Sequence, residues 1–172
     1  MIEWLEMAGI VNVCYNLLQP ELPLKGNYNP DMYKLYYQDT GLLVASHDEE
    51  AQEDLRKNRN LGTYKGALYE NVVGSMLRKQ GYGLYYYRNE KSTIELDFIV
   101  RDADSLVPLE VKAGDGCPRS LVKMTDGRIE DIRYGIKFSG GNIGFNSNFY
   151  TFPYFLGFLL RRFLSERNWV EK

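Results

Sequence analysis

The 172-residue chain has 44% hydrophobic residues, which is enough to bury one core, or one core with a small additional unit. A formal net charge of −2 excludes a general attraction to polyanions, so contact with nucleic acid requires a local basic patch. The single histidine, His47, argues against a Ser-His-Asp triad and a histidine-rich zinc site, and we expect it to be solvated. The cysteines, Cys14 and Cys117, lie far apart and no signal peptide is present, so we expect a reducing, cytoplasmic location.

The first third of the chain is predicted to combine short helices and strands. Apolar residues at near-helical spacing over 2–11, with no capping residue before them, predict a helix cut from a longer polypeptide. The next predicted elements are a strand over 11–15, a proline-containing loop over 17–30, a strand over 33–39 and a turn at 39–41. The polar run 47–60 predicts a solvated helix or a linker, and we place a subdomain boundary near residue 60.

Beyond residue 60, helices and strands follow one another as in an α/β protein. The predicted elements are a helix over 65–80, strands over 83–88, 92–100 and 107–113, a helix over 120–125, a strand over 134–139, a Gly/Asn loop and a terminal helix. We expect the helices to cover a central mixed sheet. The apolar stretch 149–160 is too short to span a membrane, and it predicts a strand end followed by a helix whose first residue is Pro153.

Acidic residues on three consecutive predicted elements are the main functional signal. Glu70 lies on the apolar side of the long predicted helix, as judged by the residues three, four and seven positions away. Glu95 and Asp97 share one face of a predicted strand, and Glu110 shares a face of the next strand with Lys112. Taken alone, each pattern favours an ordinary ion pair or a solvent-facing edge. Taken together, they place several carboxylates beside one lysine.

Such a set of residues predicts a metal site. Converging carboxylates repel one another unless a cation lies among them. Mg²⁺, or Mn²⁺ in its place, prefers oxygen ligands and usually binds one or two carboxylates together with water and substrate phosphate. Glu70, Asp97 and Glu110 are the candidate ligands, and Lys112 would assist a metal-bound water and neutralise charge on a phosphate. These four residues are the candidate catalytic set.

The same residues resemble the motif of the PD-(D/E)xK nuclease superfamily. Asp97 is followed after about a dozen residues by Glu110-x-Lys112, and helical Glu70 precedes them. The predicted helix–strand–strand–strand–helix–strand order is similar to the restriction-endonuclease-like fold of that superfamily. One position differs from the motif, because Leu96 stands where the superfamily has its namesake proline.

A narrower resemblance covers almost the whole chain. Seven segments, in order, resemble the family catalogued as domain of unknown function 4143: WLEMAGIV, LPLKG, KLYYQDTGLL, GALYENVV, ELDFIV, PLEVKAG, and YGIKFSGGNIG with FPYFLGFLL. That family usually forms the C-terminal part of prokaryotic AAA-type ATPases. The chain has no GxxxxGK(S/T) motif, so the resemblance implies an N-terminal ATPase domain that is missing from this chain.

These observations lead to one expected architecture and two competing functions. We expect a small N-terminal α+β, winged-helix-like subdomain over residues 1–60 and a restriction-endonuclease-like domain over residues 61–172. The leading function is a divalent-metal-dependent DNA nuclease. The alternative is a catalytically inactive nuclease-like module for DNA binding, oligomerisation or regulation of the ATPase, and a weaker one is a purely structural domain. DNA and a second copy of the chain are the further candidate partners, and no membrane association is expected.

Overall fold

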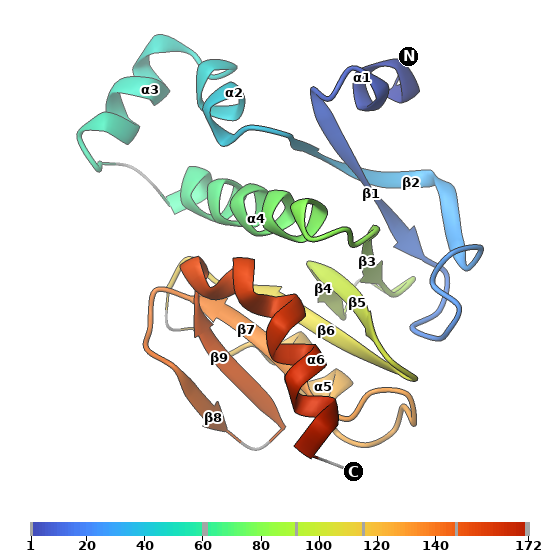
Figure 1. Cartoon of the computed structure of the whole chain (residues 1–172). Coiled ribbons are helices and arrows are strands. Elements are labelled where there is room, and N and C mark those ends of the chain that lie inside the picture. The colour runs from blue at the N-terminus through green and yellow to red at the C-terminus, as the bar shows by residue number, and fades with distance from the viewer. Residues whose placement is uncertain (1, 60–61, 92, 115, 147, 171–172) are drawn as a thin grey trace.

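The computed structural model describes residues 2–59, 62–91, 93–114, 116–146 and 148–170 (Figure 1). The strands are β1 (Val11–Leu17), β2 (Tyr28–Tyr37), β3 (Leu84–Arg88), β4 (Glu95–Leu96), β5 (Phe98–Asp102), β6 (Ser105–Val111), β7 (Gly135–Ser139), β8 (Gly144–Asn146) and β9 (Phe149–Pro153). The helices are α1 (Ile2–Met7), α2 (Thr40–Ala45), α3 (Glu49–Arg56), α4 (Gly62–Lys79), α5 (Arg119–Met124), the 3-10 helix η1 (Tyr154–Leu159) and α6 (Leu160–Val170).

Within the described residues, the strands form two mixed sheets, with strand orders β2-β1-β3-β4 and β5-β6-β7-β9-β8. In the first sheet, β1 pairs antiparallel with β2 and parallel with β3, and β3 pairs antiparallel with β4. In the second, β5 is antiparallel to β6, β6 and β7 are parallel, β7 and β9 are parallel, and β8 is antiparallel to β9. The expected α/β class is therefore confirmed, but the described strands form two mixed sheets rather than the single central sheet that was expected.

The expected division of the chain falls between residues 60 and 61, which lie outside the described residues. Strands on the two sides of this position share one sheet, because β1 lies between β2 and β3. The pairing of β1 with β3 runs from Cys14 opposite Leu84 to Asn16 opposite Tyr86. The division into two subdomains stays a prediction.

Helices cover both faces of the five-stranded sheet. Alternate strand residues face opposite sides, so Phe98 and Leu109 belong to a core cluster with Val73 of α4, whereas Ile99 belongs to a second cluster with Leu121 of α5. Figure 1 shows α4 running between the β1–β2 hairpin and the five-stranded sheet. Among the described helices, none combines the length and apolar character that a membrane span requires.

Two glycines let the covering helices approach the sheet. A methyl group at Gly74 of α4 would lie 3.2 Å from the ring of Phe98, so glycine allows α4 close contact with β5. A methyl group at Gly135 would lie only 2.4 Å from Leu121 Cδ1, so β7 can pack against α5 only without a side chain there.

Three sequence-based predictions of local structure were wrong. The strand expected over 92–100 is interrupted at Asp97, because the Asp97 carboxylate accepts the Val111 N–H at 2.7 Å and so ends the backbone ladder between β5 and β6. The turn expected at 39–41 is instead the start of α2, which Asp39 caps by accepting the Gly41 N–H. Pro153 ends β9 in an extended conformation and precedes the 3-10 helix η1 rather than beginning an α-helix.

Candidate active site

Glu70 projects from α4 toward strand β2, and hydrogen bonds of the next residue fix this arrangement. Buried Asn71 accepts the Tyr37 N–H at 2.7 Å and donates to the Tyr37 carbonyl at 3.1 Å, which ties α4 to β2. The Tyr36 hydroxyl then donates to Glu70 Oε2 at 3.1 Å. The helical carboxylate is therefore half-buried, as expected from its position on the apolar side of α4.

Asp97 occupies the junction between β4 and β5, where the chain leaves one sheet and enters the other. Its Oδ2 accepts the backbone N–H of Val111, the residue between Glu110 and Lys112. This bond brings the half-buried carboxyl group to the end of β6, next to the Glu-x-Lys segment. The structure therefore places Asp97 beside the Glu110-x-Lys112 segment.

Glu110 and Lys112 form an ion pair at the end of β6. Glu110 is 3% exposed, and its Oε1 lies 2.6 Å from Lys112 Nζ. Its Oε2 accepts the Leu121 N–H of α5 at 3.1 Å, so the carboxylate points toward the α5 face of the sheet. The Tyr154 hydroxyl donates to the Lys112 carbonyl and holds the backbone at this point. The Glu110 carboxylate and the Lys112 ammonium are thus each other's counter-ions at this strand end.

Sequence reasoning missed Lys34, a second lysine at the site. Its Nζ lies 2.9 Å from Glu95 Oε1 and 3.9 Å from Glu70 Oε2, and 5.1 Å from the ring centroid of Tyr86. Lys34 and Tyr36 are two residues apart on β2, and both reach the Glu70 carboxylate. Because side chains alternate between the two faces of a strand, the sequence over 33–39 indicates that Lys34 and Tyr36 share a face. It does not indicate which residues that face contacts.

The carboxylates and ammonium groups influence one another electrostatically. Burial and the neighbouring carboxylates of Glu70 and Glu110 raise the pKa of Asp97 to about 7, although the Val111 N–H and Lys34 oppose this shift. Burial acts to lower the pKa of Lys112, but the hydrogen bond that its ammonium donates to Glu110 and the nearby carboxylates raise this pKa overall. Lys34 behaves in the same way, with Glu95 as its hydrogen-bonding partner. Four carboxylates and two lysines therefore form one interacting set, called here the acidic cluster: Lys34, Glu70, Glu95, Asp97, Glu110 and Lys112.

The donor chemistry of the acidic cluster suits a hard divalent cation, because all four acidic groups offer carboxylate oxygens. The Lys34 ammonium already holds a positive charge between Glu70 and Glu95. However, no three His, Cys, Asp or Glu side chains of the described residues are arranged to hold a metal ion together. Glu70 and Glu110 come from opposite faces of the sheet, since α4 and α5 cover different sides, and they approach Asp97 from different directions.

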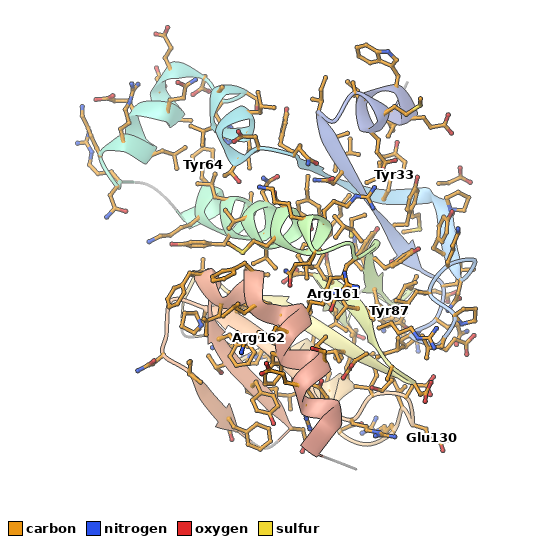
Figure 2. The ribbon with its side chains drawn as sticks, in the orientation of Figure 1. Tyr33, Tyr64, Tyr87, Glu130, Arg161 and Arg162 are labelled. Carbon is orange, nitrogen blue, oxygen red and sulfur yellow. The ribbon has the colours of Figure 1, made fainter. Side chains whose placement is uncertain are left out.

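Three other polar residues, His47, Arg161 and Arg162, make contacts within the protein. His47 is half-buried rather than solvated, with its ring centroid 5.0 Å from that of Tyr64 (Figure 2). Arg161, on α6, donates to the Gln80 carbonyl at 2.8 Å and so caps the end of α4, whereas neighbouring Arg162 pairs with Glu166 at 2.7 Å (Figure 2). These two arginines are therefore engaged within the protein.

Comparison with known proteins gave one match. A family model described as "Domain of unknown function (DUF4143)" matches residues 65–154. This range contains Glu70, Asp97, Glu110 and Lys112, but not Lys34. The comparisons with curated proteins and with solved structures gave no match.

Proposed function

Since the chain belongs to the DUF4143 family, we propose, from the geometry of its acidic cluster, that it is a divalent-metal-dependent nuclease domain acting on DNA. The observation that carries the proposal is the convergence of acidic groups from separate elements at one strand end. The hydrogen bond from the Val111 N–H holds the Asp97 carboxyl group beside the ion pair of Glu110 and Lys112, and the carboxylates of Glu70 and Glu110 both act to raise the pKa of Asp97. A phosphodiester is the substrate that such a combination of carboxylates, metal and lysine suits.

The arrangement of elements supports a restriction-endonuclease-like core. Helix α4 precedes β3, which pairs antiparallel with β4; β5 pairs antiparallel with β6; and β6 pairs parallel with β7 through a connection that contains α5. When β4 and β5 are counted as one interrupted strand, this is the helix–strand–strand–strand–helix–strand order expected of such a core. The acidic cluster lies where its second strand is interrupted, between β4 and β5.

Each residue of the proposed site has a definite role. Glu70, Asp97 and Glu110 would hold Mg²⁺ or Mn²⁺, with rearrangement of the longer side chains. The bound ion would lower the pKa of a water molecule and neutralise charge on the phosphate. Lys112 would leave Glu110 to orient the attacking water and to contact the phosphate, and its side chain is 36% exposed.

The proposal extends to partners of the domain. An N-terminal AAA-type ATPase would regulate the nuclease, and residues 1–60 would form the small subdomain between them. Strand β2 of this subdomain supplies Lys34 and Tyr36 to the acidic cluster. A movement of β2 would therefore change the charge balance around Glu70 and Asp97, which gives the ATPase a direct physical route to the site.

The second candidate is a catalytically inactive module for DNA binding, oligomerisation or regulation of the ATPase. Two ammonium groups favour it, because Lys34 and Lys112 already neutralise three of the four carboxylates by direct ion pairs. In this alternative the lysines are permanent counter-ions, and the acidic cluster connects β2, α4 and β6. The absence of a ready three-ligand group among the described residues also favours it.

DNA cleavage separates the two candidates. We expect the chain to cleave single- or double-stranded DNA with Mg²⁺ or Mn²⁺ and to lose at least about a hundredfold in rate on Lys112→Met substitution, because the group that serves water and phosphate is removed. Lys123→Met on α5 is the matched control, since Lys123 is exposed and lies outside the acidic cluster. Cleavage by Lys112→Met at the wild-type rate, or no cleavage by the wild type, would contradict the nuclease proposal.

A further inference from the structure

A cavity of about 460 Å³ lies on the α5 side of the five-stranded sheet, apart from the carboxylates of the acidic cluster. Its walls come from the start and middle of α5, from β7 and from the segment around β8 and β9. The residues that carry the argument are Pro118, Val122, Lys137, Asn148, Phe149 and Thr151. The volume is in the usual range of small-molecule sites.

Lys137 of β7 is the distinctive residue of this cavity. It is 8% exposed, and within the described part of the chain it forms no hydrogen bond or ion pair. Its neighbour in the β6–β7 register is Glu110, but the carboxylate of Glu110 is already engaged by Lys112 and by the Leu121 N–H. Its side chain is enclosed by protein except where it lines the cavity, so the ammonium has no internal counter-charge among the described residues and a ligand with negative charge would supply one.

The remaining walls fit a ligand with an anionic group and a flat organic part. The Thr151 hydroxyl and the Asn148 amide are neutral polar groups, and Asn148 Nδ2 donates to the Thr125 carbonyl at 2.6 Å. Pro118, Val122 and Phe149 supply apolar surface. One carboxylate also lines the cavity, that of Asp126.

The Asp126 carboxylate does not supply the missing partner for Lys137. Its Oδ2 lies 3.0 Å from Arg128 Nε, and its Oδ1 accepts the Arg128 N–H at 3.1 Å. Arg128 therefore offsets the negative charge of Asp126 at the cavity. The Lys137 ammonium remains the charged group that selects the ligand.

We propose that this cavity binds a phosphate monoester of nucleotide size. A lysine ammonium is a compact point charge that suits a phosphate oxygen, and the neighbouring hydroxyl and amide groups can form hydrogen bonds with the other phosphate oxygens. The apolar wall would contact a base. The phosphate monoester comes either from a free nucleotide or from the 5′ end of a nucleic-acid strand. The site uses none of the proposed metal ligands, so it does not depend on nuclease activity.

Binding is tested by calorimetry and by the thermal unfolding midpoint of the whole chain, with inorganic phosphate, AMP and a 5′-phosphorylated octathymidylate as probes. We expect inorganic phosphate to raise the midpoint in proportion to the logarithm of its concentration above Kd, and AMP or the oligonucleotide to bind more tightly. Lys137→Met should weaken binding at least about tenfold and should fold, because it removes a charge that makes no ion pair within the described residues and keeps a similar side-chain volume. Lys25→Met, an exposed lysine outside the cavity, is the matched charge control and should bind like the wild type.

A second variant tests the cavity with Lys137 still present. Val122 is 44% exposed on α5, so Val122→Trp should be tolerated while it fills the cavity, and it should also abolish binding. Binding of AMP but not the oligonucleotide would support a free nucleotide, and the reverse would support a strand end. No binding of any probe to the wild type would overturn the proposal, as would equal binding to wild type and Lys137→Met.

Discussion

At the scale of single residues, Asp97 combines a structural and a chemical role. By accepting the Val111 N–H, its side chain replaces a backbone hydrogen bond and allows the chain to pass from the first sheet to the second. The same bond holds the carboxyl group near the ion pair of Glu110 and Lys112. A residue of this kind belongs to both the fold and the site, and its ionisation affects both.

The raised pKa of Asp97 predicts a pH-dependent stability. The folded chain retains a proton on Asp97 between about pH 4 and pH 7, whereas the unfolded chain does not, so this group makes stability fall as pH rises through that range. Asp97→Asn keeps an acceptor for the Val111 N–H but cannot ionise. We expect the variant to be more stable than the wild type at pH 8, by on the order of 2 kcal/mol, and to lose this advantage near pH 4.

Urea unfolding of the two proteins at pH 4, 6 and 8 measures this difference. Asp104→Asn is the control, because Asp104 is fully exposed in the β5–β6 turn. A difference between wild type and Asp97→Asn that stays constant across the three pH values would refute the assigned ionisation.

Lys34 predicts a competition between an internal cation and a metal ion. If the proposed metal site is correct, an ion that uses Glu70 must displace the ammonium that lies 3.9 Å from Glu70 and 2.9 Å from Glu95. Lys34→Met removes this competitor while keeping a similar side-chain volume. We expect Mg²⁺ affinity, measured by calorimetry, to rise by about tenfold, since neighbouring positive charge is lost. Lys79→Met, at the exposed end of α4, should leave the affinity unchanged.

At the scale of elements, Asn71 determines how α4 meets β2. Its amide satisfies the N–H and the carbonyl of Tyr37 and also donates to Thr40 Oγ1 at 3.0 Å. This places Glu70 beside Tyr36 and Lys34, so the contact between two elements assembles half of the acidic cluster. The site therefore depends on a buried polar residue that does not itself belong to it.

Loss of the Asn71 amide should destabilise the chain strongly. Asn71→Ala removes the side-chain partner of the N–H and the carbonyl of half-buried Tyr37, for which we expect a loss of about 2–4 kcal/mol in the free energy of unfolding. Asn12→Ala is the matched control, because Asn12 is also buried but its Nδ2 donates no hydrogen bond to any of the described residues. Urea denaturation should show a clearly smaller loss for Asn12→Ala, and equal losses would contradict the role given to Asn71.

The elements differ in how well the sequence predicts them. Helix α4 and strands β3, β6 and β7 were predicted within a few residues, because their apolar patterns are periodic and local. The interruption of the strand at Asp97 was not predicted, because it depends on a hydrogen bond from a residue fourteen positions away. Strand β8 was missed within the Gly/Asn loop because its three residues are all exposed and carry no burial pattern.

The candidate site was predicted only in part for the same reason. Glu70, Asp97, Glu110 and Lys112 follow from local patterns on neighbouring elements. Lys34 reaches the site because β1 pairs with both β2 and β3, and a parallel pairing between distant strands leaves no local mark in the sequence. Lys137 was missed because a single lysine in an apolar strand does not reveal whether its side chain has a partner.

At the scale of the whole molecule, both the nuclease and the non-catalytic module depend on how the negative charges of the acidic cluster are neutralised. The chain is weakly acidic, with a net charge of −2, and Arg161 and Arg162 at the start of α6 are engaged in internal contacts. Productive contact with DNA would therefore depend on a cation bound among the carboxylates and on Lys112. The sheets, by joining β1 to β3, keep the N-terminal strands and the acidic cluster in one arrangement.

Calorimetric titration of the whole chain with Mn²⁺ at pH 8 tests the central claim most directly. At this pH Asp97 is ionised, so a carboxylate metal site should be available without competition from its proton. We predict one binding event in the wild type and in the exposed-surface variant Asp104→Asn, and at least about tenfold weaker binding in Asp97→Asn, which removes a ligand but retains the hydrogen bond to Val111. No detectable binding to the wild type, or the same affinity in Asp97→Asn, would contradict the metal-dependent nuclease and leave the non-catalytic module.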